Sequence, residues 1–195
     1  MTVSIVLFIV ASYLAGSIPT GLILAKFFHK QDIRQAGSGN IGATNVTRVL
    51  GKKLGIITFA GDVLKGFLPV CVGAWIFSSM WATAVFGFAT FLGHLFPVYL
   101  GFRGGKGVAT AFGVLLYVAP LILPIEIILF AAVVALWRCV SLGSLTAAAS
   151  MPVVLLIFSF PSSTVLLSIA MAFLIFFKHT SNIKRLLNGT ENRIY

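Results

Sequence analysis

The segment WATAVFGFATFLGHLFPVYL, residues 81–100, contains no aspartate, glutamate, lysine or arginine. A helix of about 20 mostly apolar residues is long enough to cross the hydrocarbon core of a bilayer. The next seven residues, GFRGGKG at 101–107, contain four glycines and two cations, Arg103 and Lys106. The two segments together predict a membrane helix that ends in a flexible, positively charged loop at the polar surface.

The composition extends this prediction to the whole chain. Of its 195 residues, 59% are hydrophobic and 9% are charged. A soluble domain carries about 25% charged residues, so we expect a single integral membrane domain over residues 1–195. The net charge of +10 indicates a membrane surface rather than a nucleic acid, because no basic run forms a soluble face. The expected surroundings are the lipid bilayer, with the protein as a monomer.

Apolar runs divide the chain into predicted spans. Five runs each predict one membrane span: 3–28, 54–77, 81–100, 142–159 and 163–178. The run 108–137 is too long for one helix, and Pro120 and Pro124 favour a turn within it. Two short helices there give an all-α bundle of about seven transmembrane helices. A count of five or six spans remains an alternative, because the run 108–137 is short for two membrane helices.

The 14 lysines and arginines predict the orientation. They lie in or near 26–53, at Lys65, in 101–107, at Arg138 and in the tail from Lys178. The alternate turns, 78–80, 119–124 and 159–163, contain none. Because positive charge is kept in cytoplasmic loops, the N-terminus should lie outside and the C-terminus in the cytoplasm. Glu126 and Asp32 are expected to be ordinary charges at helix edges.

Three polar segments then lie on the cytoplasmic side. In GSGNIGATNVTRVLG, residues 37–51, we expect a short helix from Gly42 to Leu50 that carries Thr44 and Arg48 on one face. It either holds an anion or lies on lipid headgroups. In GGKG, residues 104–107, glycine amides and Lys106 resemble a phosphate cradle, although a tight basic turn would look the same. This sequence is not a Walker A motif.

The third segment is KHTSNIKRLLNGTE, residues 178–191. His179 and Asn182 would share one face of a helix, but a basic tail attracted to anionic lipid is the competing interpretation. Ser141 and Ser144, at the cytoplasmic start of a helix, either cap it or contact a ligand. Within the second apolar run, Asp62 and Lys65 form either a structural or a functional ion pair.

Several kinds of chemistry lack the residues they need. None of the three histidines has a carboxylate at metal-ligand spacing, and no acidic pair would hold Mg²⁺. A Ser–His–Asp relay is also missing. Anion binding by glycine, cations, asparagine, serine and histidine remains, which suits a phosphorylated substrate handled at a membrane without metal or cofactor.

The three segments together resemble the cytoplasmic motifs of the acyl-phosphate-dependent glycerol-3-phosphate acyltransferases, the PlsY family. The matching stretches are GSGNIGATNVTRVLGKKLG at 37–55, GHLFPVYLGFRGGKGVAT at 93–110 and KHTSNIKRLLNGTE at 178–191, and DVLKG at 62–66 agrees as well. The resemblance implies acyl transfer from acyl phosphate to the sn-1 hydroxyl of glycerol 3-phosphate, giving lysophosphatidic acid and phosphate. It also implies the bacterial cytoplasmic (inner) membrane, with the active site on the cytoplasmic face.

The resemblance suggests roles for the polar residues of these segments. One phosphate would contact the first segment, at Ser38, Asn40, Thr44, Asn45 and Arg48. Phosphate would also contact the second segment, at Arg103, Gly104, Gly105, Lys106 and Gly107. His179 and Asn182 would orient glycerol 3-phosphate, with Ser141 and Ser144 as further contacts. His94 either acts as a base or fixes the loop, and which segment takes which substrate is left open.

Two other functions compete with acyl transfer. A transporter or channel for an organic phosphate would need polar groups at mid-bilayer depth, where only Asp62 and Lys65 are expected. A CDP-alcohol phosphotransferase would need paired acids for its metal, which this sequence lacks.

Overall fold

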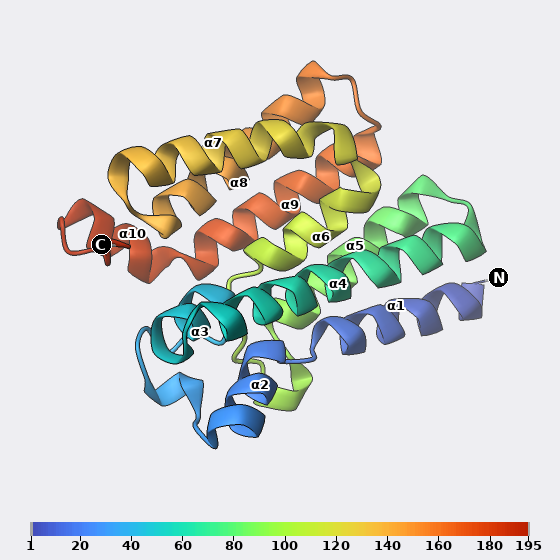
Figure 1. Cartoon of the computed structure of the whole chain (residues 1–195). Coiled ribbons are helices and arrows are strands. Elements are labelled where there is room, and N and C mark those ends of the chain that lie inside the picture. Colours follow the sequence, from blue (N-terminus) through green and yellow to red (C-terminus); the bar gives the residue numbers. More distant parts are fainter. Residues whose placement is uncertain (1, 195) are drawn as a thin grey trace. The chain divides into compact units, whose positions relative to one another are not determined.

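The structure is a computed structural model that describes residues 2–194. Every regular element in this range is a helix, as predicted (Figure 1). The helices form two compact units, one ending at Tyr117 and the other beginning at Val118. The prediction of one domain over residues 1–195 stays a prediction, because compactness alone does not say whether the units act together.

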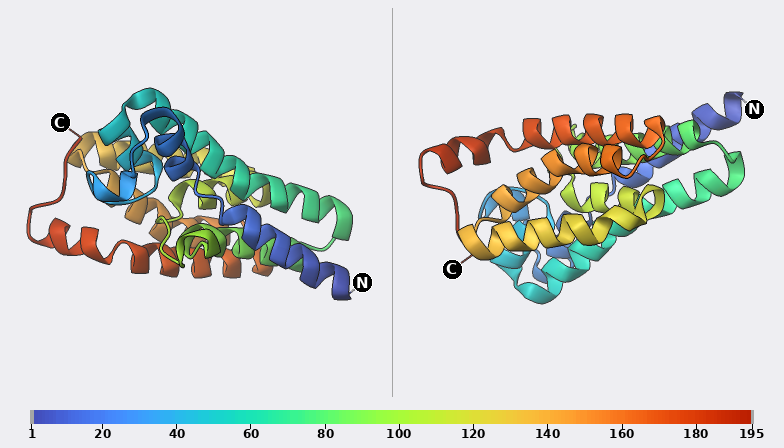
Figure 2. Two further views of the ribbon diagram at one scale, coloured as in Figure 1. Left: turned by 90° about the horizontal axis from the view of Figure 1, so that it is seen from below. Right: turned by 90° about the horizontal axis from the view of Figure 1, so that it is seen from above.

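The first unit consists of membrane-length helices and short connecting elements. In chain order they are α1 (Thr2–Gly16), α2 (Thr20–His29), η1 (Ile33–Gln35), α3 (Ala43–Leu50), α4 (Lys52–Phe77), α5 (Met80–Leu95), η2 (Val98–Leu100) and α6 (Val108–Val118). Helix α1 packs against both α4 and α5, and α3 packs on α4. Figure 2 shows α1 running alongside the hairpin of α4 and α5.

The second unit is smaller. It contains η3 (Pro120–Ile122), α7 (Leu123–Trp137), α8 (Val140–Ile157), α9 (Ser162–Lys178) and α10 (Thr180–Leu187). Helix α8 packs against both α7 and α9. Pro120 and Pro124 stand at the start of η3 and near the start of α7, so the predicted break within 108–137 is confirmed. Prolines fit these positions because the first turn of a helix needs no amide donor.

Length and composition identify five candidate membrane spans among the described residues: Thr2–His29, Lys52–Phe77, Met80–Leu100, Pro120–Trp137 and Val140–Ile157. The pair α9 and α10, which is bent by 62°, makes a sixth if the two helices count as one broken span. Helix α6 has 11 residues and is therefore about 16 Å long, roughly half of the bilayer core. The protein is a multi-pass helical membrane protein, and the count of seven spans stays a prediction.

The span predicted over 3–28 coincides with the candidate span Thr2–His29, but it consists of two helices, α1 and α2, rather than one. The chain leaves the helix at Ser17 and re-enters it at Thr20. Pro19 has no amide hydrogen and disfavours a helical conformation at the residue before it. The break is therefore encoded by Pro19, and it leaves the Ile18 carbonyl available to other donors.

The prediction for Glu126 is also wrong. This carboxylate is 6% exposed, and its Oε2 accepts a hydrogen bond of 2.8 Å from the Ser150 hydroxyl of α8. A buried carboxylate needs such a partner, so Glu126 links α7 to α8. Asp32 does behave as an edge charge, since it pairs with Arg34 at 2.6 Å on the surface.

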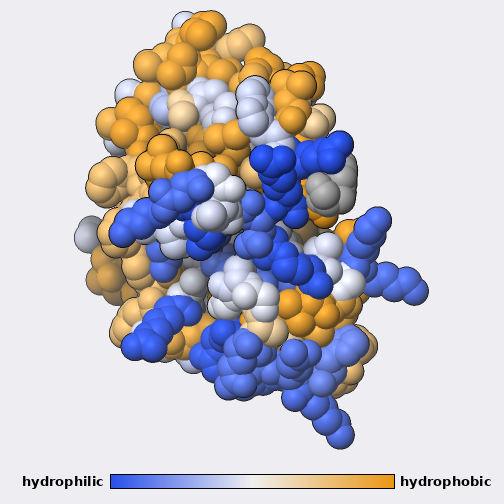
Figure 3. Space-filling view, turned by 90° about the vertical axis from the view of Figure 1, so that its left-hand side faces the viewer, coloured by the Kyte–Doolittle hydropathy of each residue, from blue (hydrophilic) through white to orange (hydrophobic). Residues whose placement is uncertain are grey.

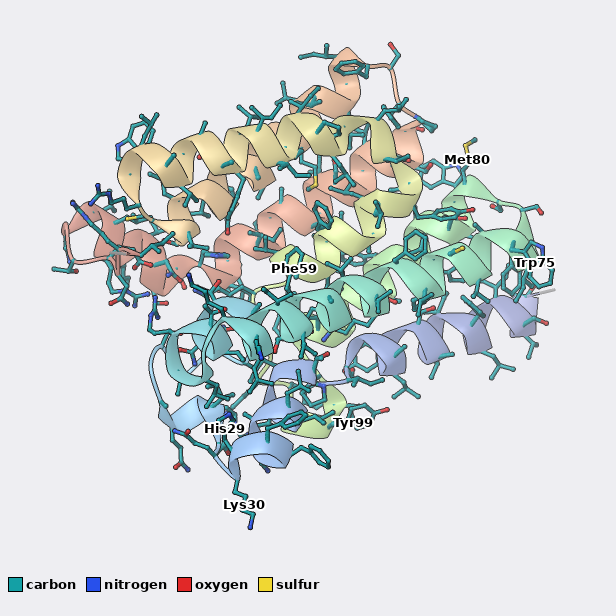
Figure 4. All side chains as sticks on the ribbon, viewed as in Figure 1. His29, Lys30, Phe59, Trp75, Met80 and Tyr99 are labelled. Carbon is teal, nitrogen blue, oxygen red and sulfur yellow. The ribbon has the colours of Figure 1, made fainter. Side chains whose placement is uncertain are left out.

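The two ends of the first unit should lie on opposite sides of the membrane. Met80 marks the turn between α4 and α5, and His29 lies at the other end of the unit (Figure 4). With Cys71 and Cys139 replaced by serine, Met80→Cys should react with an impermeant thiol reagent added to intact cells. His29→Cys should react only after permeabilisation. Labelling of both variants in intact cells would contradict the orientation derived from charge.

Candidate active site

Asn45 organises the first polar segment. Its side-chain Nδ2 lies within hydrogen-bond distance of three carbonyl oxygens, those of Ile33 at 3.2 Å, Ala36 at 3.0 Å and Asn40 at 2.8 Å. Its Oδ1 accepts from the Ser38 amide at 2.7 Å. Asn45 is 2% exposed. The predicted contact of this side chain with phosphate therefore does not hold, because its amide is already used to fold the loop.

Three other residues of this segment do face outward. Ser38, Thr44 and Arg48 are exposed, and Thr44 and Arg48 lie one turn apart on α3, as predicted. The opposite face of the same helix carries Val46, which is fully buried. Asn40 has a local role, because its Oδ1 accepts from the Gly42 amide at 2.8 Å just before α3.

One hydrophobic cluster joins the first polar segment to the second. It consists of Leu22, Ala25, Ile33, Ile41, Val46 and Leu54, with Leu100 packed against it. Leu100 directly precedes the GFRGGKG loop. Each buried aliphatic side chain of this size stabilises the folded state by about 1.5–3 kcal/mol. Segments far apart in the sequence are thus held next to each other within the first unit.

The glycine-rich loop packs directly on the end of α5. The Gly105 amide donates to the His94 carbonyl at 3.1 Å, and the Gly104 amide donates to the Leu95 carbonyl at 3.2 Å. These carbonyls belong to the last turn of α5, where they have no partner within the helix. The prediction that these two amides bind phosphate therefore does not hold. Any ligand contact of the loop falls to Lys106, Gly107 and the exposed Arg103.

His94 lies beneath this loop. It is 4% exposed, and a Cβ added to Gly105 would lie 2.1 Å from its Nε2. Only glycine leaves room for the imidazole at that point. Of the two roles left open for His94, the structure favours fixing the loop.

A residue that the sequence did not single out dominates the second unit. The carboxylate of Glu191 accepts from the Ser141 hydroxyl at 2.9 Å, from Asn182 Nδ2 at 2.6 Å and from Arg185 Nε at 2.7 Å. Burial tends to raise the pKa of Glu191, but these three hydrogen bonds outweigh burial and lower it. The Ile194 amide also donates to the Arg138 carbonyl at 2.9 Å, so the C-terminal segment folds back over the unit.

The remaining candidates of the second unit are buried near helix ends. The Ser144 hydroxyl donates to the Val140 carbonyl at 2.9 Å within α8. His179 lies at the bend between α9 and α10, and its Nδ1 is 2.8 Å from the Ile175 carbonyl. Because a carbonyl oxygen can only accept, we place a proton on Nδ1 of His179. Asn182 follows one turn later and is 4% exposed.

Figure 3 shows hydrophilic residues in blue and hydrophobic residues in orange. Within residues 2–194, no group of three or more His, Cys, Asp and Glu side chains could hold a metal ion. The polar groups present can bind anions, through exposed cations and through hydroxyl and amide donors.

Comparison with known proteins identifies the family. The family model described as glycerol-3-phosphate acyltransferase matches residues 6–189. The chain belongs to the glycerol-3-phosphate acyltransferase family. A relative of that name from Geotalea daltonii is 48% identical over 193 residues, 98% of each chain. One from Geobacter metallireducens is 52% identical over 189 residues, 96% of each chain.

Solved structures of this family share the fold. The crystal structure of PlsY, an integral membrane glycerol 3-phosphate acyltransferase, in its glycerol 3-phosphate form is 41% identical with a TM-score of 0.94. That match covers 98% of this chain and 96% of the other. The lysophosphatidic acid form is 40% identical with a TM-score of 0.92 over the same shares. The family resemblance read from the three motifs is thereby confirmed.

Gly105→Ala should strongly lower acyltransferase activity, because the added methyl group collides with the His94 ring. A displacement of about 1 Å at a reacting centre can cost roughly 100-fold in rate, and we expect a loss of that order in kcat/KM. Gly101→Asn is the matched control, since nothing lies within 4 Å of its added Cβ and asparagine tolerates the left-handed backbone of Gly101, whose φ is 58°. Equal activity of the two variants would argue against close packing of His94 and Gly105.

Acid should weaken the hydrogen bonds of Glu191. Because its pKa in the folded state is lowered from 4.5, it stabilises the fold above that value, and this stabilisation is lost as the pH falls through the folded-state pKa. Between pH 7 and pH 4, the melting temperature of wild type should therefore fall more than that of Glu191→Gln. Asp32→Asn is the control, because the pKa of Asp32 is about 2. Parallel curves for wild type and Glu191→Gln would contradict the prediction.

Proposed function

We propose that this protein transfers a fatty acyl group from acyl phosphate to the sn-1 hydroxyl of glycerol 3-phosphate. The products are lysophosphatidic acid and inorganic phosphate. The observation that carries the proposal is the likeness over 98% of the chain to PlsY structures in glycerol 3-phosphate and lysophosphatidic acid forms. Those two molecules are the acceptor and the acylated product of one reaction.

The chemistry of acyl phosphate suits the residues present. An acyl phosphate is a mixed anhydride, so its phosphate departs readily and no strong acid is needed. The harder task is to hold two substrates that both carry negative phosphate groups. Fixed cations and hydrogen-bond donors in a partly dry site can offset that repulsion, because charges interact more strongly away from water.

In the first unit we assign phosphate binding to two cations, of which Arg48 is exposed and Lys106 is half-buried. The hydrophobic cluster contains Val46 of α3, the helix that carries Arg48. Leu100, which precedes the loop that carries Lys106, packs against the same cluster. Ser38 and Thr44 supply hydroxyl donors beside Arg48, and Arg103 adds charge at the loop surface. Asn45 shapes the first polar segment and His94 shapes the glycine-rich loop, so both help to position these phosphate-binding residues.

In the second unit we assign the acceptor alcohol to Asn182 and His179. The hydroxyl oxygen of glycerol 3-phosphate attacks the acyl carbonyl carbon, and the bond to the phosphate oxygen then breaks with its electron pair. A phosphate oxygen of the substrates takes the hydroxyl proton, since the Nε2 side of the His94 ring is covered by Gly105. Ser141 and Ser144 help to shape the α8 end of this unit.

The setting of the reaction follows from the charges and the lipid-facing surface. We place the site on the cytoplasmic face of the inner membrane, where the cation-rich loops are expected. The fatty tail of acyl phosphate stays in the bilayer, since many large apolar side chains are exposed on the helices, among them Ile56, Leu68 and Phe173. The bound substrates need no cofactor for the steps described.

Purified protein in detergent should convert acyl phosphate and glycerol 3-phosphate to lysophosphatidic acid with a metal chelator present. Arg48→Ala and Lys106→Ala should each lower kcat/KM by about 100-fold or more, because a charge that pairs with phosphate is lost. Product can be followed by chromatography of radiolabelled lipid. Lys53→Ala is the matched control, because Lys53 is an exposed cation in the first turn of α4.

Two results would contradict the proposal. One is activity with acyl-CoA but none with acyl phosphate. The other is uptake of glycerol 3-phosphate into liposomes without conversion, which would favour a transporter. Wild-type turnover in both Arg48→Ala and Lys106→Ala would refute the assigned phosphate site while leaving the reaction itself intact.

A further inference from the structure

A buried charge pair lies in the middle of α4. Asp62 is 2% exposed and Lys65 is 8% exposed. Their Oδ1 and Nζ atoms are 2.9 Å apart. Charges at this depth in a membrane helix are costly and usually serve a purpose. The roles assigned so far use neither residue.

Lys65 reaches from α4 to the break in the first span. Its Nζ donates to the Ile18 carbonyl at 2.8 Å. This carbonyl lies in the break at Pro19, outside both helices, where it also accepts the Thr20 amide at 3.1 Å. Lys65 therefore ties α4 to the point where α1 gives way to α2, the helix that contributes Leu22 and Ala25 to the hydrophobic cluster beneath α3.

Asp62 reaches from α4 in another direction, towards α5. Its Oδ1 lies 3.7 Å from Nδ1 of His94. The other side of the same ring contacts Gly105, and the His94 carbonyl accepts the Gly105 amide at 3.1 Å. Polar and close-packed contacts thus run from Ile18 through Lys65, Asp62 and His94 to the glycine-rich loop.

The next turn of α4 holds the other end of that loop. A Cβ added to Gly66 would lie 2.3 Å from the Thr110 carbonyl of α6. Gly66 follows Asp62 by four residues, so both lie on one face of α4. The loop between α5 and α6 is therefore fixed on both sides by a single turn of α4, at His94 through Asp62 and at Thr110 through Gly66.

Simple packing does not require these charges. A buried ion pair can often be replaced by apolar residues without loss of stability. Its hydrogen bonds, however, hold the partner atoms at a preferred distance and angle, which apolar contacts do not. A charged pair is thus suited to fixing the relative positions of α4, α5 and the α1–α2 break more narrowly than apolar contacts would.

We propose that Asp62 and Lys65 are positioning residues that set the place of the Gly104–Lys106 loop, and thereby the affinity for the phosphate-bearing substrate. Neither residue touches substrate; both act through His94 and the Ile18 carbonyl. The inference rests on the proposed function, because it concerns how the same loop presents Lys106.

The test is kinetic, with a variant that separates positioning from stability. The double variant Asp62→Asn/Lys65→Met leaves no unpaired charge, so it should fold and extract with detergent like wild type. We expect its KM for glycerol 3-phosphate or for acyl phosphate to rise at least tenfold. We also expect faster hydrogen exchange in peptides covering 101–107. Val70→Ala is the matched control, a fully buried position in the same helix, which should lower stability and leave KM unchanged.

The outcomes separate this inference from the proposed function. If wild type makes no lysophosphatidic acid, the proposed function fails. If wild type is active and the double variant keeps wild-type KM values and wild-type exchange in 101–107, the positioning role is overturned. A rise in KM in Val70→Ala equal to that in the double variant would also overturn it, because general destabilisation would then explain both.

Discussion

Backbone amide and carbonyl groups cannot be left unpaired in hydrocarbon, and this constraint shapes the whole protein. It forces the chain into helices and confines irregular backbone to helix ends and to places where other groups supply partners. The GFRGGKG loop illustrates this, since its Gly104 and Gly105 amides pair with the last carbonyls of α5. The break at Ile18 illustrates it again, because the freed carbonyl receives the Lys65 ammonium. The glycine-rich loop and the break at Ile18 are thus positioned by the way in which neighbouring helices end.

Much of the fold was predictable because hydropathy reports the membrane directly. The apolar runs, the turn at Ser78–Ser79 and the short helix ended by Gly51 were all readable from residue type. Proline was harder to interpret. Pro120 and Pro124 begin helical elements as expected, and Pro19 breaks a run that hydropathy alone joins. Pro69 and Pro152 lie inside α4 and α8. Local sequence does not distinguish these cases, because neighbouring helices decide whether the lost hydrogen bond is tolerated.

The candidate site was predictable in its cations and less so in its hydrogen bonds. Charge and helical spacing led to the predictions for Arg48, Lys106, His179 and Asn182, which stay predictions. The inward use of Asn45 and of the glycine amides, and the central place of Glu191, depend on contacts between segments distant in sequence. The carboxylate of Glu191 meets Ser141, which lies 50 residues away. One signal could have pointed to Glu191: the chain has four acidic residues in all. Each carboxylate in so apolar a chain needs a partner, because removing one partner of a buried charge pair costs about 3–5 kcal/mol.

The close approach of α4 and α6 restricts how this chain can vary. A Cβ at Gly66 would lie 2.3 Å from the Thr110 carbonyl, and one at Gly113 would lie 2.0 Å from the Val63 carbonyl. In lipid, helices associate through such tight contacts between small residues rather than through a hydrophobic driving force. Apolar substitutions among the lipid-facing side chains of the same helices should be widely tolerated. Any larger residue at these two glycines would force α4 and α6 apart. Mutational tolerance should therefore change from one side of a single helix to the other.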